Sequence, residues 1–256
     1  MDLRPITTDN IERAVGPWHA DDELLIGKLR WLLHTPYAHG LLVDRYEDDV
    51  LAVGGCTHYG ITGWITLLQS IDPEAHRILA EGLLAHLVAQ GNSTQSTLSP
   101  LADVALWETL GFVQTETILR YSGGKFIQAT HDEVIHYEAW HRMALLRLAK
   151  SAMGEDRSTL LMEHTYLGQV YAEGSGIRGF SLLLLGQGLI IADDPKVGLE
   201  LQRWHFPLQE HVLIPAGNEA AHKHLTEQGY TTTVEGIRMV RGPVPELQVE
   251  MVFGWG

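Results

Sequence analysis

Two side chains that can accept or donate a proton, His58 and Tyr59, stand together at the end of the apolar stretch from Val50. Histidine is the side chain most often used as a general base, and a tyrosine hydroxyl can serve the same purpose. We therefore take His58 and Tyr59 as candidate catalytic residues for a proton transfer. The alternative interpretation is that both side chains are merely solvated at a strand end.

The other residues able to do chemistry are 14 histidines and one cysteine. Two histidine pairs are close in sequence, His136 with His141 and His222 with His224, but neither has the His-Glu-x-x-His spacing of a familiar metal motif. On a helix, residues two apart lie on different faces. No metal site is therefore predicted. Cys56 lies in an apolar stretch, which is typical of a buried, inert thiol.

Charge and cysteine content limit the classes of partner. The chain has 256 residues, with 18 lysines and arginines against 32 aspartates and glutamates, a net charge of −14. Such a field repels phosphate backbones and anionic lipids, so nucleic acid and membrane partners are not expected. A single cysteine excludes an intrachain disulfide and favours a reducing compartment. With no signal peptide and no apolar run of about 20 residues, the sequence predicts a cytoplasmic protein.

An internal repeat organises the chain. Residues 107–112 and 225–230 each predict a helix end followed by a glycine and an aromatic residue, Gly111–Phe112 and Gly229–Tyr230. In both copies an arginine follows nine residues after the glycine, at Arg120 and at Arg238. The glycine fits a left-handed helix C-cap, a conformation that only glycine adopts without strain. The aromatic residue then begins a strand.

A second match marks the start of each copy. Ile6–Ile11 parallels Ala129–Val134, and in both stretches polar residues that can cap a helix follow a predicted strand. Ser122–Gly124 is a suitable hinge between the copies. The sequence therefore predicts two domains, residues 1–122 and residues 123–256.

Both copies are expected to alternate strands with helices. In the first copy, strands are predicted at 3–6, 40–45, 50–58, 64–71, 95–98 and 112–121, and helices at 9–34, 73–90 and 101–110. In the second copy, strands are predicted at 167–173, 180–185, 189–192, 211–214, 230–240 and 248–253, with helices at 132–162 and starting near 195 and 218.

This order of elements resembles the GCN5-related N-acetyltransferase (GNAT) fold. The late helix of that family carries an Asn-x-x-Ala pattern and ends in Gly-Phe or Gly-Tyr, as Asn218–Ala221 and Gly229–Tyr230 do. The second copy is also similar to a C-terminal domain of bacterial tandem proteins of this type; the matching stretches are 154–157, 160–161, 192–195, 238–242 and 252–254. The resemblance implies an α/β (α+β) fold with two tandem GNAT domains, each a mixed, mostly antiparallel sheet flanked by helices.

The resemblance also implies a cofactor, acetyl-CoA or another acyl-CoA. In the family, pantetheine lies between the splayed fourth and fifth strands, and the pyrophosphate meets the N-terminus of the next helix. The first copy would then bind pantetheine through backbone groups of three residues and the pyrophosphate through four more. The two sets are Leu67, Leu68 and Gln69, and His76, Arg77, Ile78 and Leu79.

Both copies depart from the family's cofactor loop, which is roughly Arg-Gly-x-Gly-x-Gly. The first copy has none of these glycines in residues 69–79, and the second places Asp193 and Asp194 at the mouth of an anion site. The position of the family's proton-donating tyrosine holds Trp107 in one copy and Leu225 in the other. Neither side chain can protonate a leaving thiolate.

Two functions remain open. The first is an acyl-CoA-dependent N-acetyltransferase that acts on a small amine acceptor by direct transfer, with His58 or Tyr59 as the general base. The second is a non-catalytic ligand-binding or scaffold protein that keeps the GNAT fold with a degenerate cofactor loop. The oligomeric state is also left open, with a homodimer among the alternatives.

Overall fold

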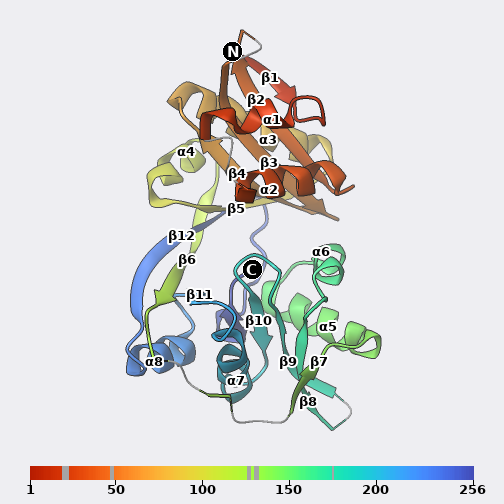
Figure 1. Cartoon of the computed structure of the whole chain (residues 1–256), viewed down its shortest axis with the longest axis vertical. Helices are drawn as coiled ribbons and strands as arrows, with labels where there is room; N and C mark the ends of the chain where they lie inside the picture. The colour runs from red at the N-terminus through yellow and green to blue at the C-terminus, as the bar shows by residue number, and fades with distance from the viewer. Residues whose placement is uncertain (19–22, 47–48, 126–127, 130–132, 175) are drawn as a thin grey trace. The chain divides into compact units, whose positions relative to one another are not determined.

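The computed structural model describes residues 1–18, 23–46, 49–125, 128–129, 133–174 and 176–256. The chain divides into two compact units (Figure 1). The first contains residues 1–114 and 239–244, and the second contains residues 115–238 and 245–256. The strand β6 (Val113–Ser122) begins in the first unit and continues in the second, and β12 (Thr231–Arg241) begins in the second unit and ends in the first.

The first unit is a sheet with helices on both faces. Its strands are β1 (Asp2–Pro5), β2 (Ala38–Arg45), β3 (Asp49–Tyr59), β4 (Thr62–Ser70) and β5 (Thr94–Ser99), followed in the sheet by the end of β12. Its helices are α1 (Ile11–Val15), η1 (Gly16–Trp18), α2 (Glu23–His34), α3 (Pro73–Ala89), η2 (Leu101–Asp103) and α4 (Val104–Thr109). All pairings from β1 to β4 are antiparallel, and β4 pairs with β5 in parallel.

Two glycines in β3 show how the helices cover this sheet. A Cβ at Gly55 would lie 2.2 Å from Leu32 of α2, and a Cβ at Gly54 would lie 3.0 Å from Leu83 of α3. Successive residues of a strand face opposite sides, so α2 and α3 pack on opposite faces. The absence of side chains at both positions lets the two helices lie close to the strand.

The second unit repeats this plan. Its strands are β6 (Val113–Ser122), β7 (Val134–His136), β8 (Gln169–Glu173), β9 (Gly176–Leu182), β10 (Leu189–Ala192), β11 (His211–Pro215), β12 (Thr231–Arg241) and β13 (Val252–Gly254). Its helices are η3 (Ala139–His141), α5 (Arg142–Met153), α6 (Ser158–Glu163), α7 (Pro195–His205), α8 (Glu219–Glu227) and η4 (Val249–Met251). The strands lie in the orders β13-β10-β9-β8-β7 and β12-β6-β11.

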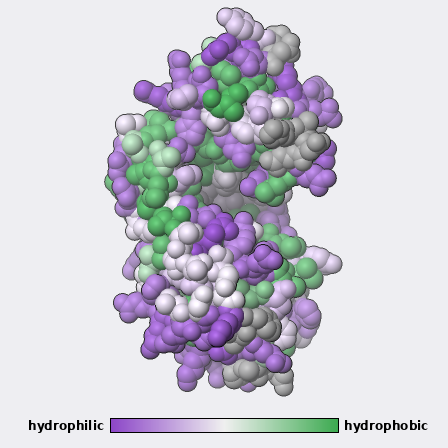
Figure 2. Space-filling model, turned by 60° about the vertical axis from the view of Figure 1, so that its left-hand side comes forward, coloured by the Kyte–Doolittle hydropathy of each residue, from purple (hydrophilic) through white to green (hydrophobic). Residues whose placement is uncertain are grey.

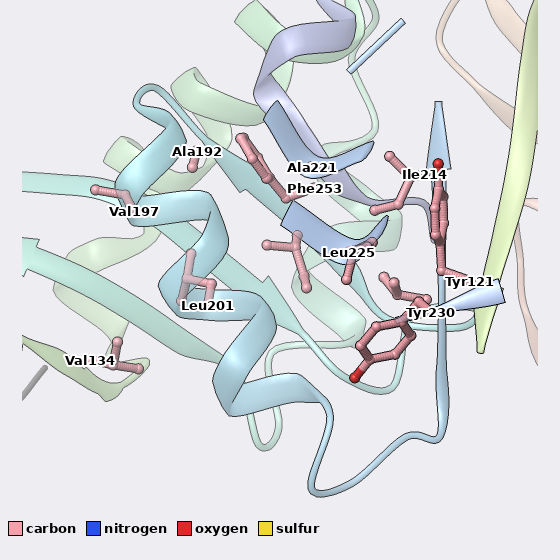
Figure 3. Packing of buried hydrophobic residues seen from close by; sticks show 12 residues of the cluster. Tyr121, Val134, Ala192, Val197, Leu201, Ile214, Ala221, Leu225, Tyr230 and Phe253 are labelled. Atoms are coloured by element: carbon pink, nitrogen blue, oxygen red, sulfur yellow. The ribbon is translucent and has the colours of Figure 1, made fainter. Parts of the chain in front are cut away.

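The core of the second unit collects around α7, α8 and the C-terminal strand (Figure 3). Phe253 of β13 is fully buried there, together with Leu201 of α7 and Leu225 of α8. Burial of each such side chain contributes about 1.5–3 kcal/mol to folding. The last residues of the chain are therefore part of the core.

The repeat elements are where the sequence placed them, with two corrections. Gly111 and Gly229 have φ of 86° and 79°, as expected for left-handed helix ends. Val134–His136, which fell in the expected helix from residue 132, instead forms β7, paired with β8. Residues 130–132, used in the match at the start of the copies, lie outside the described residues.

The helix of the second copy starts later because its cap is later. Glu138 and His141 form a capping box, in which the Glu138 amide donates to Nδ1 of His141 at 2.9 Å. The strand expected at 248–253 also begins late, since Val249–Met251 is a 3₁₀ turn and only Val252–Gly254 is a strand.

The surface in Figure 2 is largely hydrophilic, as the excess of acidic residues predicts. Hydrophilic residues are spread over much of the face in Figure 2, in keeping with the net charge of −14. Within the described part of the chain, no helix has the length and apolar character needed to cross a membrane.

Candidate functional site

In the first unit, β4 and β5 run together for only part of their length. Their parallel ladder joins Thr62–Ile65 to Thr94–Thr97, whereas β4 continues to Ser70. Both strands lie wholly within the described residues. Beyond Ile65, about 17 Å of β4, at about 3.3 Å per residue, is paired on this side with no strand of the described chain. The helix α3 begins directly after the unpaired end of β4.

A β-bulge marks the point where the ladder ends. The register between β3 and β4 shifts where Gly55 pairs with Leu67 and Cys56 pairs with Ile65, so Thr66 is the extra residue. A bulge bends its strand and increases its twist. This local bend accounts for the departure of β4 from β5.

The predicted pantetheine residues lie on this unpaired stretch. Leu67 is buried against the α2 side of the core, and Leu68 and Gln69 are partly exposed. The Oε1 atom of Gln69 is buried and has no hydrogen-bond partner among the described residues. Buried polar atoms are almost always hydrogen-bonded, so this oxygen suits a donor group of a bound ligand.

The N-terminus of α3 already holds an anion from the chain itself. Oδ1 of Asp72 accepts hydrogen bonds from the amides of Glu74 and Ala75, both at 2.9 Å, and the His76 amide donates to the backbone oxygen of Asp72. Pro73 has no amide hydrogen. A phosphate at this helix end would therefore compete with the Asp72 carboxylate.

The residues predicted to meet the pyrophosphate are distributed around this cap. The His76 ring faces Asp103, with Nε2 to Oδ2 at 3.5 Å, and Nε of Arg77 bonds Oε1 of Glu81 at 2.8 Å. Ile78 and Leu79 lie in the helix, where amides pair with carbonyls four residues earlier. Binding of a cofactor by His76 to Leu79 stays a prediction, and it now has to include displacement or neutralisation of Asp72.

The candidate catalytic residues point to opposite faces of the sheet. His58 pairs with Gly63, where a Cβ would meet Leu87 of α3, so His58 faces α3. Tyr59 faces α2: it is 6% exposed, and its ring lies 5.5 Å from the ring of Tyr37. Because of this alternation, at most one of the two can serve a given site.

Two histidines that sequence reasoning did not single out lie on the α3 face, on β2 and α3. The rings of His39 and His86 are stacked, with centroids 3.8 Å apart and planes 6° apart. Burial lowers the pKa of His39, and burial together with the charges of His39 and His58 lowers the pKa of His86. Their separation in the sequence gave no signal of this contact.

The structure also shows the surroundings of the other residues that were considered in the sequence. Cys56 is 1% exposed, and burial raises the pKa of its thiol to about 12. Trp107 and Leu225 are buried, and Trp107 packs edge-on against Phe112. His222 bonds the Tyr121 hydroxyl at 2.6 Å. Among the described residues, no group of three or more His, Cys, Asp or Glu is arranged to hold a metal ion.

In the second unit the helix α7 is capped by an aspartate, as α3 is, but an additional strand lies between the two strands that correspond to β4 and β5. Oδ1 of Asp194 accepts from the Lys196 amide at 2.8 Å, and Arg178 pairs with Asp193 and Asp194. Between β10 and β11, which correspond to β4 and β5, lies β13: it pairs with β10, and the Trp255 amide donates to the Leu213 oxygen of β11 at 2.8 Å.

Buried histidines make the fold sensitive to acid. His205 of α7 is 1% exposed, and its pKa is lowered by burial, with a further contribution from the charge of His211. The unfolded chain therefore binds a proton at a higher pH than the folded chain. Stability is complete above the unfolded pKa of about 6.5 and is lost as the pH falls from there to the folded pKa, by up to about 1.4 kcal/mol per pH unit.

We expect urea unfolding between pH 7 and pH 5 to show this loss, with a shallower slope in His205→Gln. His136→Gln, which changes an exposed residue of β7, is the matched control and should keep the wild-type slope. Equal slopes for all three proteins would contradict the assignment of the acid sensitivity to His205.

Comparison with known proteins agrees with the architecture. Residues 145–254 match the family model of an acetyltransferase (GNAT) domain. No curated protein matches the sequence. A putative acetyltransferase from Pyrococcus horikoshii superposes with a TM-score of 0.82 at 18% identity, over 99% of this chain and 93% of that one.

Two further solved structures span most of the chain. A tandem GNAT protein from the clavulanic acid biosynthesis pathway has a TM-score of 0.56 at 11% identity, over 96% of this chain and 99% of its own. A GCN5-related N-acetyltransferase from Sphaerobacter thermophilus has a TM-score of 0.55 at 14% identity, over 96% and 97%. At these identities the likeness establishes the fold. The family model thus matches part of the second unit, and the chain as a whole has the fold of a tandem GNAT protein.

Proposed function

We propose that this protein is an acyl-CoA-dependent N-acyltransferase whose first unit binds the cofactor and whose acceptor is a small amine. The observation that carries the proposal is the separation of β4 from β5 after Ile65, next to the N-terminus of α3. The likeness to GNAT proteins supports acyl transfer in general, and in the first unit no strand of the described chain lies between β4 and β5.

The residues of the first unit fit such a cofactor in part. The unpaired edge of β4 from Leu67 to Gln69 offers backbone donors and acceptors to pantetheine, and the buried Oε1 of Gln69 lacks a partner among the described residues. The bound cofactor supplies an activated acyl group as a thioester. Backbone amides of the bulged strand are suited to hold an oxyanion, the largest electrostatic contribution in acyl transfer.

The chain's own acid–base chemistry acts on the acceptor. An amine becomes a nucleophile once it loses a proton, and we assign His58 as the group that takes it. Histidine accepts this proton near neutral pH. His58 is partly exposed, whereas Tyr59 is buried among aromatic rings. The net charge of −14 attracts a cationic acceptor.

A thermal shift titration tests the proposal. Acetyl-CoA at 100 times its dissociation constant should stabilise the protein by about 2.7 kcal/mol, which corresponds to a rise in melting temperature of about 5–10 °C. Release of free thiol in the presence of candidate amines then reports transfer. No shift with millimolar acetyl-CoA or longer acyl-CoAs would contradict the proposal and favour a non-catalytic ligand-binding or scaffold protein.

Removal of the Asp72 charge should strengthen cofactor binding. Asp72→Asn keeps a helix cap, since asparagine caps as well as aspartate, but it removes the negative charge that opposes a diphosphate. Two unit charges about 4 Å apart in water interact by about 1 kcal/mol, so we expect affinity for acetyl-CoA to rise about fivefold in calorimetric titration. Asp194→Asn changes the equivalent cap in the second unit and should leave the affinity unchanged. Equal effects of the two variants would contradict cofactor binding at α3.

A further inference from the structure

The C-terminal strand β13 completes the second unit as an added strand. It pairs antiparallel with β10, Ile190 with Gly254 and Ile191 with Val252, and the intervening Phe253 forms a bulge. On its other side, the Trp255 amide donates to the Leu213 oxygen of β11 at 2.8 Å. The segment therefore joins two strand edges that would otherwise be open.

Two buried amide side chains hold the backbone of this segment from the helices. Nε2 of Gln202 donates to the Phe253 oxygen at 2.7 Å, and Nδ2 of Asn218 donates to the Val252 oxygen at 2.9 Å. Gln202 is 0% exposed and Asn218 is 1% exposed. Asn218 also caps α8, because its Oδ1 accepts from the Ala221 amide at 3.0 Å. Both side chains bind carbonyl groups that every extended peptide has.

The neighbouring surface fits the side chains of the segment. A Cβ at Gly198 of α7 would lie 2.2 Å from the Phe253 ring, so glycine at this position makes room for the aromatic ring. A Cβ at Gly254 would lie 2.6 Å from the Gly188 oxygen, so only glycine fits there without a shift. Trp255 is 4% exposed. An aromatic residue, a glycine and a second aromatic residue thus match the shape of the slot.

We propose that the slot between β10 and β11 is a binding site for an extended peptide strand, filled in cis by residues 252–255. Backbone pairing to β10 and β11 with side-chain pockets between them is the way peptides add to open sheet edges. The slot corresponds in element order to the gap between β4 and β5. If the first unit binds acyl-CoA, as the proposed function requires, each chain binds one acyl-CoA in the first unit and holds a peptide strand in the slot of the second.

Peptide complementation tests the site. A chain ending at Leu247 should melt at a lower temperature than the full chain, and a synthetic peptide of residues 248–256 should raise that temperature again. At 100 times its dissociation constant, we expect the peptide to give a rise of about 5–10 °C. A peptide with Phe253 and Trp255 replaced by serine is the matched control and should give no rise. Equal effects of the two peptides would overturn the proposal.

The full chain provides a second measurement if the shortened chain does not fold. The Trp255 amide should exchange with deuterium as slowly as amides of β10, because both would open only with the core of the unit. Exchange of Trp255 within seconds, as at a frayed chain end, would overturn the proposal. Acetyl-CoA should leave this rate unchanged; faster exchange on its addition would show that the cofactor displaces the strand and would likewise overturn it.

These readouts separate the peptide site from the proposed acyltransferase. Peptide rescue and slow exchange are measured without acyl-CoA, so they stand if the protein binds no acyl-CoA at all. With acetyl-CoA, calorimetry should give one site per full chain and no additional site in the shortened chain. A second acetyl-CoA site that appears only after removal of residues 248–256 would overturn the assignment of the slot to a peptide.

Discussion

Phe253→Ala should lower the free energy of unfolding of the second unit by about 3–5 kcal/mol. The ring is 0% exposed and packs in the cluster that includes Val197, Leu201 and Ala221. Truncation of a buried phenylalanine removes the transfer free energy of the ring and leaves a cavity, and each contributes to the loss. Because Gly198 has no side chain to fill the space, relaxation around the cavity should be small.

Calorimetric melting and urea unfolding measure the loss, which corresponds to a fall of roughly 6–20 °C in the melting temperature of a unit of this size. Trp140→Ala is the matched control, because Trp140 is an aromatic residue of the same unit that is 71% exposed. Its effect should stay within about 0.5 kcal/mol. A loss below about 1 kcal/mol for Phe253→Ala would show that the C-terminal strand does not belong to the core.

Most of the fold could be predicted from the internal repeat, because the repeat depends on local backbone requirements that are visible in the sequence. Gly111 and Gly229 both have positive φ at helix ends, and an aromatic residue packs just after each. Apolar residues at helical spacing predicted α3 over 73–90, and the observed helix is Pro73–Ala89. Such local signals do not depend on where the rest of the chain lies.

Prediction from the sequence was wrong where the secondary structure of a segment depends on its tertiary contacts. Val134–His136 is short and forms a strand only because β8 lies beside it. Val249–Met251 was expected in a strand, but the cap bond from the Met251 amide to the Gln248 oxygen closes a turn there instead. The position of the unit boundaries within β6 and β12 has no local signature either. The residue pattern of a strand does not show which unit each part of it joins.

In the candidate site, too, local features could be predicted from the sequence, whereas features that depend on tertiary packing could not. The sequence Asp72–Pro73 identifies a helix start, and the capping bonds confirm it. The same two residues explain why the Asp72 carboxylate accepts hydrogen bonds from the first-turn amides. In contrast, the stacking of His39 on His86 depends on the packing of α3 over β2. Likewise, the strand between β10 and β11 comes from the far end of the chain.

His58→Gln should lower kcat/KM for the amine acceptor by about 10²–10⁴-fold, the usual contribution of a general base. His58 is the partly exposed member of the candidate pair, and it faces the α3 side, where His39 and His86 also lie. Glutamine keeps the size and a hydrogen-bonding group but cannot take a proton. We expect the loss mainly in kcat, with affinity for acetyl-CoA retained, because the base acts on the acceptor.

Tyr59→Phe is the matched control, since it removes only a hydroxyl on the opposite face of the same strand. Its kcat/KM should stay within about threefold of the wild-type value. The pH dependence adds a second readout: the limb of the kcat/KM profile that rises with pH should be lost in His58→Gln and kept in Tyr59→Phe. If His58→Gln keeps that limb and most of its activity, another group takes the proton. If Tyr59→Phe alone loses it, the α2 face is the one that meets the acceptor, and alternation along β3 then excludes His58 from the reaction.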